Sequence, residues 1–595
     1  MEKHLYNLWK SLVCLVLFVA TTNHLQAQLS EEAHFPITIN GSMFLGHDMY
    51  NLQSTSHNAV VPSRRPASLL RFIISPTISF NDWFSLPFSF MISTPETTTI
   101  LSKPALPSTL DFIQNPANSL SLSPKFGWAQ FHLGTHTPQL SPLSGSNIQL
   151  FGLGLDFTPG KFRVTVSAGR IGRSVMTDTA TQIQGEYARE AYMGKFAFVD
   201  SLNEIGLNVV RVRDDDGSIP TLRTHRIIQP DPEDPSIVDT IALRDPLMPI
   251  PEESFTTTLN ALISLTDEAR ITAEVGGSLF TRDMTSEQIA EPISEIEPLI
   301  EQRLSTQADF AGKVEFQIDK EKWGLSLNST YIGPGYRTLA YPWMEADRFD
   351  ITAAPRLQLL NDRLAISGSI GWRQNNLGKI EEATTSQLLG SANVDVRIGE
   401  DFTINGQYSN YGLRTPVKND TFRVETVAQS ISLTPMITIA SEASSHVIMA
   451  SVSVDDYADY NIITGASESN RTHSVMGTYS TMLTSIPLST HLAGSWLTNH
   501  LEVGDLTIAS ASIGAGYELF NSAVKLGVSG SMTQTGLDVH TPDRELTLGI
   551  NGRWRITNGL LLLAKASVTN YRYGDSRPNT SFQEIFVRTS LQWQW

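Results

Sequence analysis

The end of the chain alternates between apolar and polar side chains, and this pattern limits the possible fold more than any other feature of the sequence. Counting back from Trp595, one series of alternate positions holds Trp593, Leu591, Thr589, Val587 and Ile585. The intervening series holds Gln594, Gln592, Ser590 and Arg588. Because successive side chains of a strand point to opposite faces, the segment predicts a β-strand with one mainly apolar face, one polar face and an aromatic last residue.

This last segment resembles the closing strand of bacterial outer-membrane β-barrels, in which a terminal aromatic residue is read by the barrel-insertion machinery. The resemblance implies that Leu591, Trp593 and Trp595 form an insertion signal. It also implies an outer-membrane location, with membrane lipid and the insertion machinery as partners. The overall style is similar to the large barrels of Bacteroidota, without a match to one family. Three short segments, 178–180, 200–202 and 239–241, resemble the O-glycosylation motif of that lineage.

The start of the chain predicts a secretory signal peptide over residues 1–27. Lys3 and Lys10 give a basic beginning, residues 12–20 form a short apolar core, and Ala27 offers a small residue for cleavage. The core is shorter than the roughly 20 apolar residues that a spanning helix needs, although an uncleaved anchor helix is the alternative. Cys14 is the only cysteine, so the mature chain, residues 28–595, is expected to have no disulfide and no cysteine-ligated metal.

The composition agrees with a barrel and argues against other classes of protein. No second apolar stretch approaches the length of a spanning helix, and the mean hydropathy is −0.10. Polar residues that face a lumen dilute the lipid-facing ones in a barrel, so a near-neutral value is expected there. The net charge of −17 argues against nucleic acid as a partner, because phosphate binding needs a basic surface. No linker divides the chain into separate domains.

Pairs of alternating segments are joined by short polar turns along the whole chain, and longer irregular segments separate the pairs. Turn-forming residues flanked by alternating apolar residues are a strong signal for β-hairpins. The clearest turns are residues 81–82, 159–160, 267–268, 319–322, 361–362, 399–401 and 558–559. The pattern therefore predicts an up-and-down arrangement of antiparallel strands.

We expect about 26 strands, with 24 as the alternative, because Pro124 blurs the fourth and fifth strands near 118–123 and 126–136. Both counts are even, as in bacterial single-chain barrels. The predicted fold class is all-β, a transmembrane antiparallel up-and-down β-barrel without a plug domain, because the first strand near residue 36 follows the signal peptide closely. Both termini and the short turns are expected in the periplasm, with the longer loops outside.

Ionised side chains recur on the polar face of the predicted strands. A dry core does not tolerate such groups unpaired, whereas a water-filled lumen does. A soluble β-sandwich would show the same alternation, but the signal peptide and the terminal aromatic residue favour a membrane barrel. The candidate pore-lining residues are Lys313, Glu315, Arg373, Asp395, Arg397, Arg553, Arg555, Lys565 and Arg588.

A barrel of this size is expected to be about 50 Å across, too wide for its own side chains to fill. Two long segments, 215–253 and 283–305, are candidates for folding into the lumen, and a solvated surface loop is the alternative for both. The apolar residues of the second, among them Ile289, Ile293 and Ile300, recur at helical spacing and predict a short amphipathic helix.

The sequence offers little evidence for catalysis or metal binding. Asp214, Asp215 and Asp216 form a weak calcium candidate, with a solvated acidic loop as the alternative. His132 and His136 would lie about 13 Å apart on a strand, too far to share a metal, so we expect them to be polar residues of the lumen or rim. Because no catalytic motif is present, we expect no enzymatic activity and no cofactor. A barrel hydrolase that uses Ser, His and Asp is the alternative.

The leading functional hypothesis is a pore for solutes with a lumen of mixed charge. Because charges of both signs occur, the sequence gives no prediction of ion selectivity. One alternative is a barrel subunit of a larger secretion or surface-assembly complex, whose lumen is filled by a partner protein. Another is an adhesive surface protein that presents the 215–253 segment.

Overall fold

The structure is a computed structural model of the chain. It describes residues 37–54, 61–81, 83–94, 118–145, 148–178, 182–219, 225–230, 238–243, 247–380, 382–415, 423–538, 540–575, 577 and 580–595. The predicted signal peptide, residues 1–27, lies outside these ranges.

One large sheet contains nearly all the strands. The first half consists of β1 (Ile37–Ser54), β2 (Ser68–Phe80), β3 (Phe84–Ser93), β4 (Ser119–Leu122), β5 (Lys125–Phe126), β6 (Ala129–His136), β7 (Leu150–Phe157), β8 (Phe162–Gly172), β9 (Ala188–Asp200), β10 (Asn203–Asp215), β13 (Glu253–Ser264), β14 (Ala269–Thr281), β15 (Thr306–Asp319) and β16 (Trp323–Ile332). The second half consists of β17 (Arg348–Leu359), β18 (Leu364–Gln374), β19 (Ser386–Ile398), β20 (Phe402–Thr415), β21 (Val424–Ala440), β22 (Ser444–Asp459), β23 (Asn470–Leu483), β24 (Leu488–Leu501), β25 (Gly504–Leu519), β26 (Val524–Leu537), β27 (Asp543–Arg555), β28 (Leu560–Arg572) and β29 (Ser581–Gln594).

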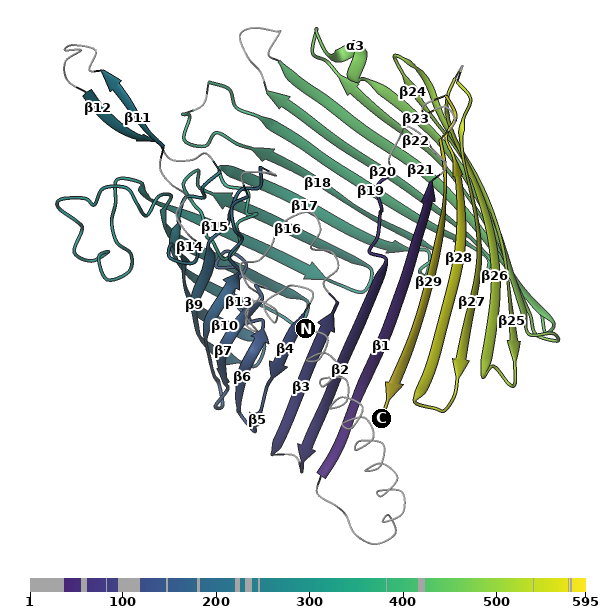
Figure 1. Cartoon of the computed structure of the whole chain (residues 1–595), viewed down its shortest axis with the longest axis horizontal. Helices are drawn as coiled ribbons and strands as arrows, with labels where there is room; N and C mark the ends of the chain where they lie inside the picture. The colour runs from purple at the N-terminus through teal and green to yellow at the C-terminus, as the bar shows by residue number, and fades with distance from the viewer. Residues whose placement is uncertain are drawn as a thin grey trace.

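The sheet closes on itself through its first and last strands. Each strand pairs antiparallel with its neighbours along the chain, and β1 pairs with β29 so that Leu45 faces Leu591. The segments β4 and β5 both pair with β3 and β6, so they share one position in the wall. The described residues thus form a closed antiparallel barrel of 26 strands, with β4 and β5 counted as one (Figure 1). The predicted fold class and the preferred strand count are confirmed.

The fourth and fifth strands divide at a different place from the predicted one. The sequence suggested a reversal near Pro124, but the chain continues through Pro124 and turns at Gly127 and Trp128. Gly127 has a φ of 54°, a left-handed conformation that glycine adopts readily. Because proline has no backbone N–H, Pro124 leaves a gap in the hydrogen bonds to the neighbouring strands. This gap separates β4 from β5 without reversing the chain.

Short turns lie at the end of the barrel that holds the first residue of β1 and the last residue of β29, which we call the turn end. The predicted turns at 159–160, 267–268, 319–322, 361–362, 399–401 and 558–559 all lie between paired strands there, and so does Asn81 of the predicted 81–82 turn. Asp82 lies outside the described residues. Most of the longer connections lie at the opposite end, which we call the loop end.

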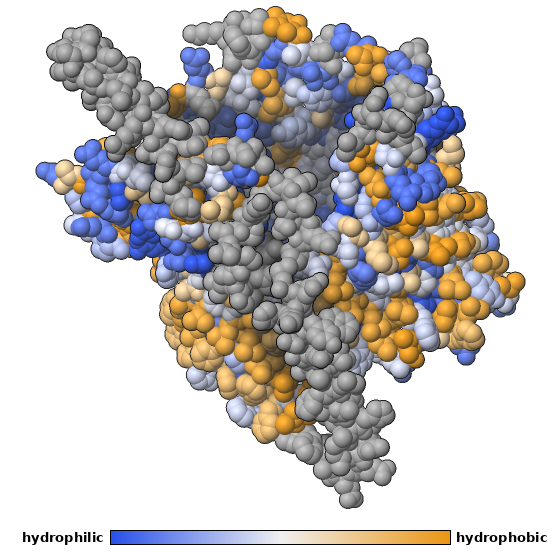
Figure 2. Space-filling view, in the orientation of Figure 1, coloured by the Kyte–Doolittle hydropathy of each residue, from blue (hydrophilic) through white to orange (hydrophobic). Residues whose placement is uncertain are grey.

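The outer face of the wall is apolar. On β27 the side chains of Leu546, Leu548, Ile550 and Trp554 are exposed on one face, and Ile556 continues this series. From Leu546 to Ile556 the strand runs about 34 Å, or about 26 Å in height at a tilt of about 40°. This height matches the apolar band of a transmembrane barrel. Figure 2 shows hydrophobic residues gathered over the outside of the strands. The chain is a large outer-membrane β-barrel.

Helical structure is almost absent from the described residues. The helix α3 (Gly465–Glu468) has 4 residues. None of the helices in the described ranges has the length and apolar character needed to cross a membrane.

Parts of the two predicted inward loops extend away from the wall. Within 215–253, strands β11 (His225–Pro230) and β12 (Val238–Leu243) form a separate hairpin that projects from the loop end (Figure 1). Segment 283–305 also extends outward, and Ile293 is 56% exposed. The predicted amphipathic helix in this segment is wrong. Backbone bonds such as Ile300 N–H to Ile296 O close single turns that do not continue as a helix.

Candidate functional site

The inner face of the barrel carries the predicted pore-lining residues. In an antiparallel pair, directly opposed residues share a face, so the register fixes the face of each side chain. All nine lie on the face opposite the exposed aliphatic residues: Lys313, Glu315, Arg373, Asp395, Arg397, Arg553, Arg555, Lys565 and Arg588. Their role in a pore stays a prediction.

These charged residues are distributed over separate sectors of the wall and do not form a ring. Two of them pair with a carboxylate on the neighbouring strand. Arg373 Nε donates to Asp350 at 2.7 Å, and Arg588 donates to both carboxylate oxygens of Asp48, at 2.7 and 2.6 Å. Asp395 accepts a hydrogen bond from the Asn405 amide at 2.6 Å. The inner charges are therefore partly neutralised by their neighbours.

Neutral hydroxyl groups cover the inner face between these charged sectors. Serine and threonine pairs bond across adjacent strands, for example Ser369 with Ser391 at 2.8 Å and Ser453 with Ser474 at 2.7 Å. A shallow cavity of about 460 Å³ lies on this part of the wall. Its lining includes Ser367, Ser369, Ser391, Asn393, Gln407 and Ser409. This hydroxyl wall can hydrogen-bond a polar solute without a strong preference for its charge.

Segment 137–149, between β6 and β7, enters the lumen from the loop end; residues 146–147 are not described. It is held by polar groups on the inner wall. The Leu143 N–H donates to Glu274 Oε1 at 3.0 Å, and Ser141 Oγ bonds Thr258 Oγ1 at 2.6 Å. Glu274 lies about 24 Å along β14 from Thr281, where that strand ends at the loop end. The segment therefore reaches deep into the barrel.

Segment 333–347, between β16 and β17, folds inward beside it. The Leu339 N–H donates to Ser254 Oγ at 3.0 Å, and Ser278 Oγ donates to the Arg337 carbonyl. The Tyr336 hydroxyl donates to the Leu143 carbonyl at 2.9 Å, which joins the two segments. We call 137–149 and 333–347 the inner loops.

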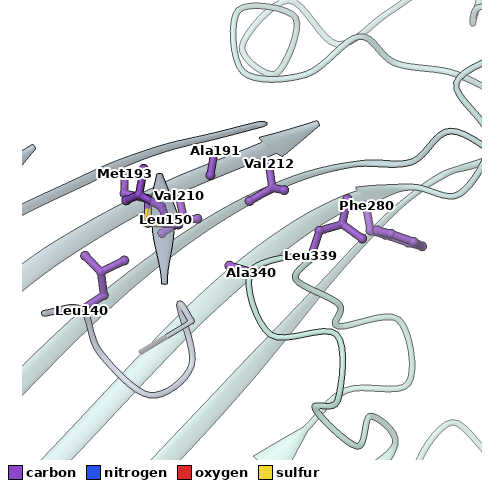
Figure 3. Close-up of a cluster of buried hydrophobic side chains, with 9 residues drawn as sticks. All are labelled: Leu140, Leu150, Ala191, Met193, Val210, Val212, Phe280, Leu339 and Ala340. Atoms are coloured by element: carbon purple, nitrogen blue, oxygen red, sulfur yellow. The ribbon is translucent and has the colours of Figure 1, made fainter. Parts of the chain in front are cut away.

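An apolar cluster attaches the inner loops to one sector of the wall (Figure 3). Leu140, Leu339 and Ala340 come from the loops. They pack on wall residues that are almost fully buried: Leu150, Ala191, Met193, Val210, Val212 and Phe280. Removing a valine or leucine side chain from water stabilises a structure by about 1.5–3 kcal/mol, so this cluster holds the loops firmly.

The sequence analysis missed the inner loops, although a signal for them was present. Val210 and Val212 fall on the polar side of β10, in the same series as Asn208 and Asp214. Both valines have an exposed fraction of 0%. Apolar residues in a series that should face water indicate that another part of the chain covers them. That signal does not identify the covering segment.

Burial also shifts the ionisation of two groups that lie outside the strands. Desolvation raises the pKa of the Tyr336 phenol, and the nearby Glu274 carboxylate adds to the effect. The phenol therefore stays protonated and keeps donating to Leu143. Desolvation likewise raises the pKa of the Glu252 carboxyl above its ordinary value.

The two histidines lie much closer together than predicted. The rings of His132 and His136 stack with centroids 5.0 Å apart, so the expected separation of about 13 Å is wrong for the imidazoles. Gly134, between them, has a φ of 90°, and its carbonyl bonds His136 Nδ1 at 3.1 Å. This local bend brings the two side chains together on the inner face.

A hydrogen-bonded chain of Ser123, His132 and Asp156 crosses three strand positions on the inner wall. His132 Nδ1 lies 3.0 Å from Ser123 Oγ, and its Nε2 lies 2.9 Å from Asp156 Oδ2. In serine hydrolases Nε2 faces the serine and Nδ1 faces the carboxylate, so the order here is reversed. Ser123 is only 8% exposed, and its own backbone N–H donates to Pro87 O. The geometry favours a structural polar network.

The acidic run proposed for calcium is not brought together as a site. Asp214 accepts two hydrogen bonds from Arg189, at 2.7 and 3.1 Å, and one from the Glu252 N–H at 3.0 Å. Asp215 accepts from the Gly217 N–H at 3.2 Å. Within the described ranges, no group of three or more His, Cys, Asp or Glu side chains converges to hold a metal. The alternation of β10 also directs Asp214 and Asp215 to opposite faces.

No protein-family model and no curated protein matches this chain. Solved outer-membrane proteins are similar in structure. OpdK of Pseudomonas aeruginosa with vanillate is 10% identical, with a TM-score of 0.29 over 58% of this chain and 93% of that chain. OccAB3 of Acinetobacter baumannii is 9% identical, with a TM-score of 0.30 over 58% of this chain and 93% of that chain. A loop-deletion mutant of OmpT from Vibrio cholerae is 8% identical, with a TM-score of 0.23 over 66% and 100%. The Bacteroidota lineage stays a prediction.

Proposed function

We propose that this outer-membrane barrel is a pore for water-soluble solutes, narrowed by its two inner loops. The observation that carries the proposal is the attachment of both loops to one sector of the inner wall, through the cluster of Leu140, Leu339 and Ala340. The hydroxyl wall belongs to other strands, and this arrangement supports a narrowed aqueous passage between the loops and that wall.

The inner loops have the properties of a fixed constriction. Their backbone bonds to Glu274 and Ser254 and the hydrogen bond from Tyr336 to Leu143 hold them in place from several directions. Well-packed apolar contacts and satisfied polar groups resist local opening. We therefore expect the loops to set a constant upper limit on the size of a passing solute.

The chemistry of the inner face supports broad selectivity for polar solutes. Arginines such as Arg373 and Arg588 are compensated by Asp350 and Asp48. Rings of uncompensated charge set ion preference in many pores. Because the charges on the inner face of this barrel are distributed over several sectors and partly paired, we expect little discrimination between cations and anions.

The direct test is conductance of the purified, folded full chain in a planar bilayer. We expect open channels whose conductance rises when residues 138–145 of the first inner loop are replaced by a short glycine linker. The matched control is removal of residues 225–243, which include the β11–β12 hairpin that projects away from the wall and should leave conductance unchanged. A folded protein that never conducts would contradict the pore. A stable co-purifying protein that blocks conductance would instead support a subunit of a larger complex.

A further inference from the structure

Two arginines face each other on the outer surface at the loop end of the barrel. Arg544 is the second residue of β27 and Arg572 is the last residue of β28, and the register pairs them directly. They lie on the same face as the exposed Leu546 and Leu548, and both arginines are themselves exposed. Directly opposed residues have Cβ atoms about 5 Å apart, so the two positive side chains share one patch of surface.

The height of this pair on the barrel corresponds to lipid headgroups. The apolar belt of β27 begins at Leu546 and ends at Ile556, about 26 Å lower at a tilt of about 40°. Arg544 lies about 7 Å along the strand beyond Leu546, just outside that belt. In bacterial barrels the long loops face outward, which places the two arginines at the outer leaflet.

Neither arginine has a carboxylate partner among the residues that the structure describes. Asp543 and Glu545 flank Arg544 in the sequence, but they belong to the inner face, where Asp543 accepts a hydrogen bond of 3.0 Å from the Tyr571 hydroxyl. The next residues across the sheet are Gln534 beside Arg544 and Ser581 beside Arg572. The row of four opposed side chains therefore contains two positive charges and no negative charge.

Other arginines on the same face and at the same end are compensated. Arg471, the second residue of β23, donates from Nε to Asp456 at 2.8 Å. Arg414 lies 3.8 Å from Glu425 on the adjacent strand. The barrel thus places carboxylates beside its outer arginines elsewhere, and the pair on β27 and β28 is the exception in this comparison.

Two like charges placed directly opposite each other across a sheet are unfavourable unless an anion lies between them. A phosphate group carries nearly two negative charges and several acceptor oxygens, and guanidinium groups bind phosphate through paired hydrogen bonds. We propose that Arg544 and Arg572 together bind the phosphate of a phosphorylated lipid headgroup in the outer leaflet. The proposal depends on the membrane location of the barrel and is independent of its role as a pore.

Binding of lipid A to the purified full chain in detergent tests this proposal. The probes are diphosphoryl lipid A, dephosphorylated lipid A and inorganic phosphate, each titrated against the wild type and the double variant Arg544→Gln/Arg572→Gln. The control variant is Arg471→Gln, which removes an arginine that already has a carboxylate partner. Heat-dependent mobility on electrophoresis verifies that each variant is folded. If the double variant does not fold, the single variants Arg544→Gln and Arg572→Gln replace it.

We expect the double variant to bind diphosphoryl lipid A about tenfold more weakly than the wild type, from the loss of charged hydrogen bonds. Each single variant should show a smaller loss, and Arg471→Gln should bind as the wild type does. Dephosphorylated lipid A should bind the wild type and the double variant equally weakly. Unchanged affinity of the double variant, or an equal loss in Arg471→Gln, would overturn the proposal. Inorganic phosphate that binds as tightly as lipid A would overturn the assignment to a lipid.

Discussion

The hydroxyl of Tyr336 donates a hydrogen bond of 2.9 Å to the backbone carbonyl of Leu143. This bond connects two loops that enter the lumen from strands far apart in the sequence, and both of its partners are buried. The phenol lies next to the Glu274 carboxylate, which in turn accepts from the Leu143 N–H. The two inner loops therefore act as one unit on the inner wall.

Replacing Tyr336 with Phe should weaken the link between the inner loops. The change leaves a buried carbonyl without its donor, which costs about 1–3 kcal/mol. We expect a less stable protein in detergent and more frequent fluctuations of channel current in a bilayer. The control is Tyr192→Phe, because Tyr192 is 55% exposed on the outer face. Equal behaviour of the two variants would show that the link has no mechanical role.

The Leu140→Ala variant should loosen the first inner loop from the wall. Leu140 is 8% exposed and packs in the apolar cluster, and truncation of such a residue costs about 2–5 kcal/mol. We expect a larger channel conductance together with a lower unfolding temperature. Leu259→Ala, at a position that is 51% exposed on the outer face, should leave conductance as it is.

Glu252→Gln should make stability depend differently on pH. The pKa of the Glu252 carboxyl is raised mainly by desolvation, so the folded state binds its proton more readily than the unfolded state does. The stabilising contribution is therefore present below the ordinary pKa of 4.5 and is lost as the pH rises through the higher folded value. The glutamine variant should be more stable than the wild type at neutral pH, with the difference disappearing in acid. Denaturant unfolding in detergent at several pH values would measure this, and a variant that is less stable at pH 7 would contradict it.

The Ser123→Ala variant should leave any hydrolytic activity of the preparation unchanged. The reversed order of the His132 nitrogens and the low exposure of Ser123 both favour a structural network. Purified wild type and variant would be compared on phospholipid and peptide substrates and with a serine-directed fluorophosphonate label. Labelling or turnover that depends on Ser123 would show that the barrel is an enzyme after all.

The Trp595→Ala variant should be impaired in assembly more than in final stability. The backbone of Trp595 bonds to Gly41 in both directions, at 3.0 and 3.1 Å, and these bonds remain when the side chain is removed. If the aromatic side chain is the insertion signal, cells should accumulate less folded barrel, while refolding of the purified chain in detergent should proceed normally. Equal loss in both settings would assign the side chain to stability alone.

The wall of the barrel was predictable because its information is local. Strands such as β27 alternate Leu546, Leu548 and Ile550 with polar residues, and each alternation decides both the strand and its two faces. Turn residues such as Asn361, with a φ of 54°, fix where the chain reverses. The alternation also limits the register, because a shift of one residue would turn the apolar face of a strand to the opposite side of the sheet.

The contents of the lumen were not predictable in the same way. Segment 137–149 looks like any polar loop in the sequence, and its position depends on the distant residues Glu274 and Thr258. The stacking of His132 on His136 depends on the positive φ of Gly134, which a period of two does not reveal. Both features arise from contacts between segments that are remote or from one unusual backbone angle.

The pairing of β1 with β29 has a consequence for how the barrel closes. At this joint Arg588 faces Asp48 on the inner face of the wall, and Leu591 faces Leu45 on the outer face. A shift by a single position would push the guanidinium into hydrocarbon and the leucine into water. Solvation therefore disfavours closure of the barrel in a register shifted by one residue, and favours the alignment of β1 with β29 described above.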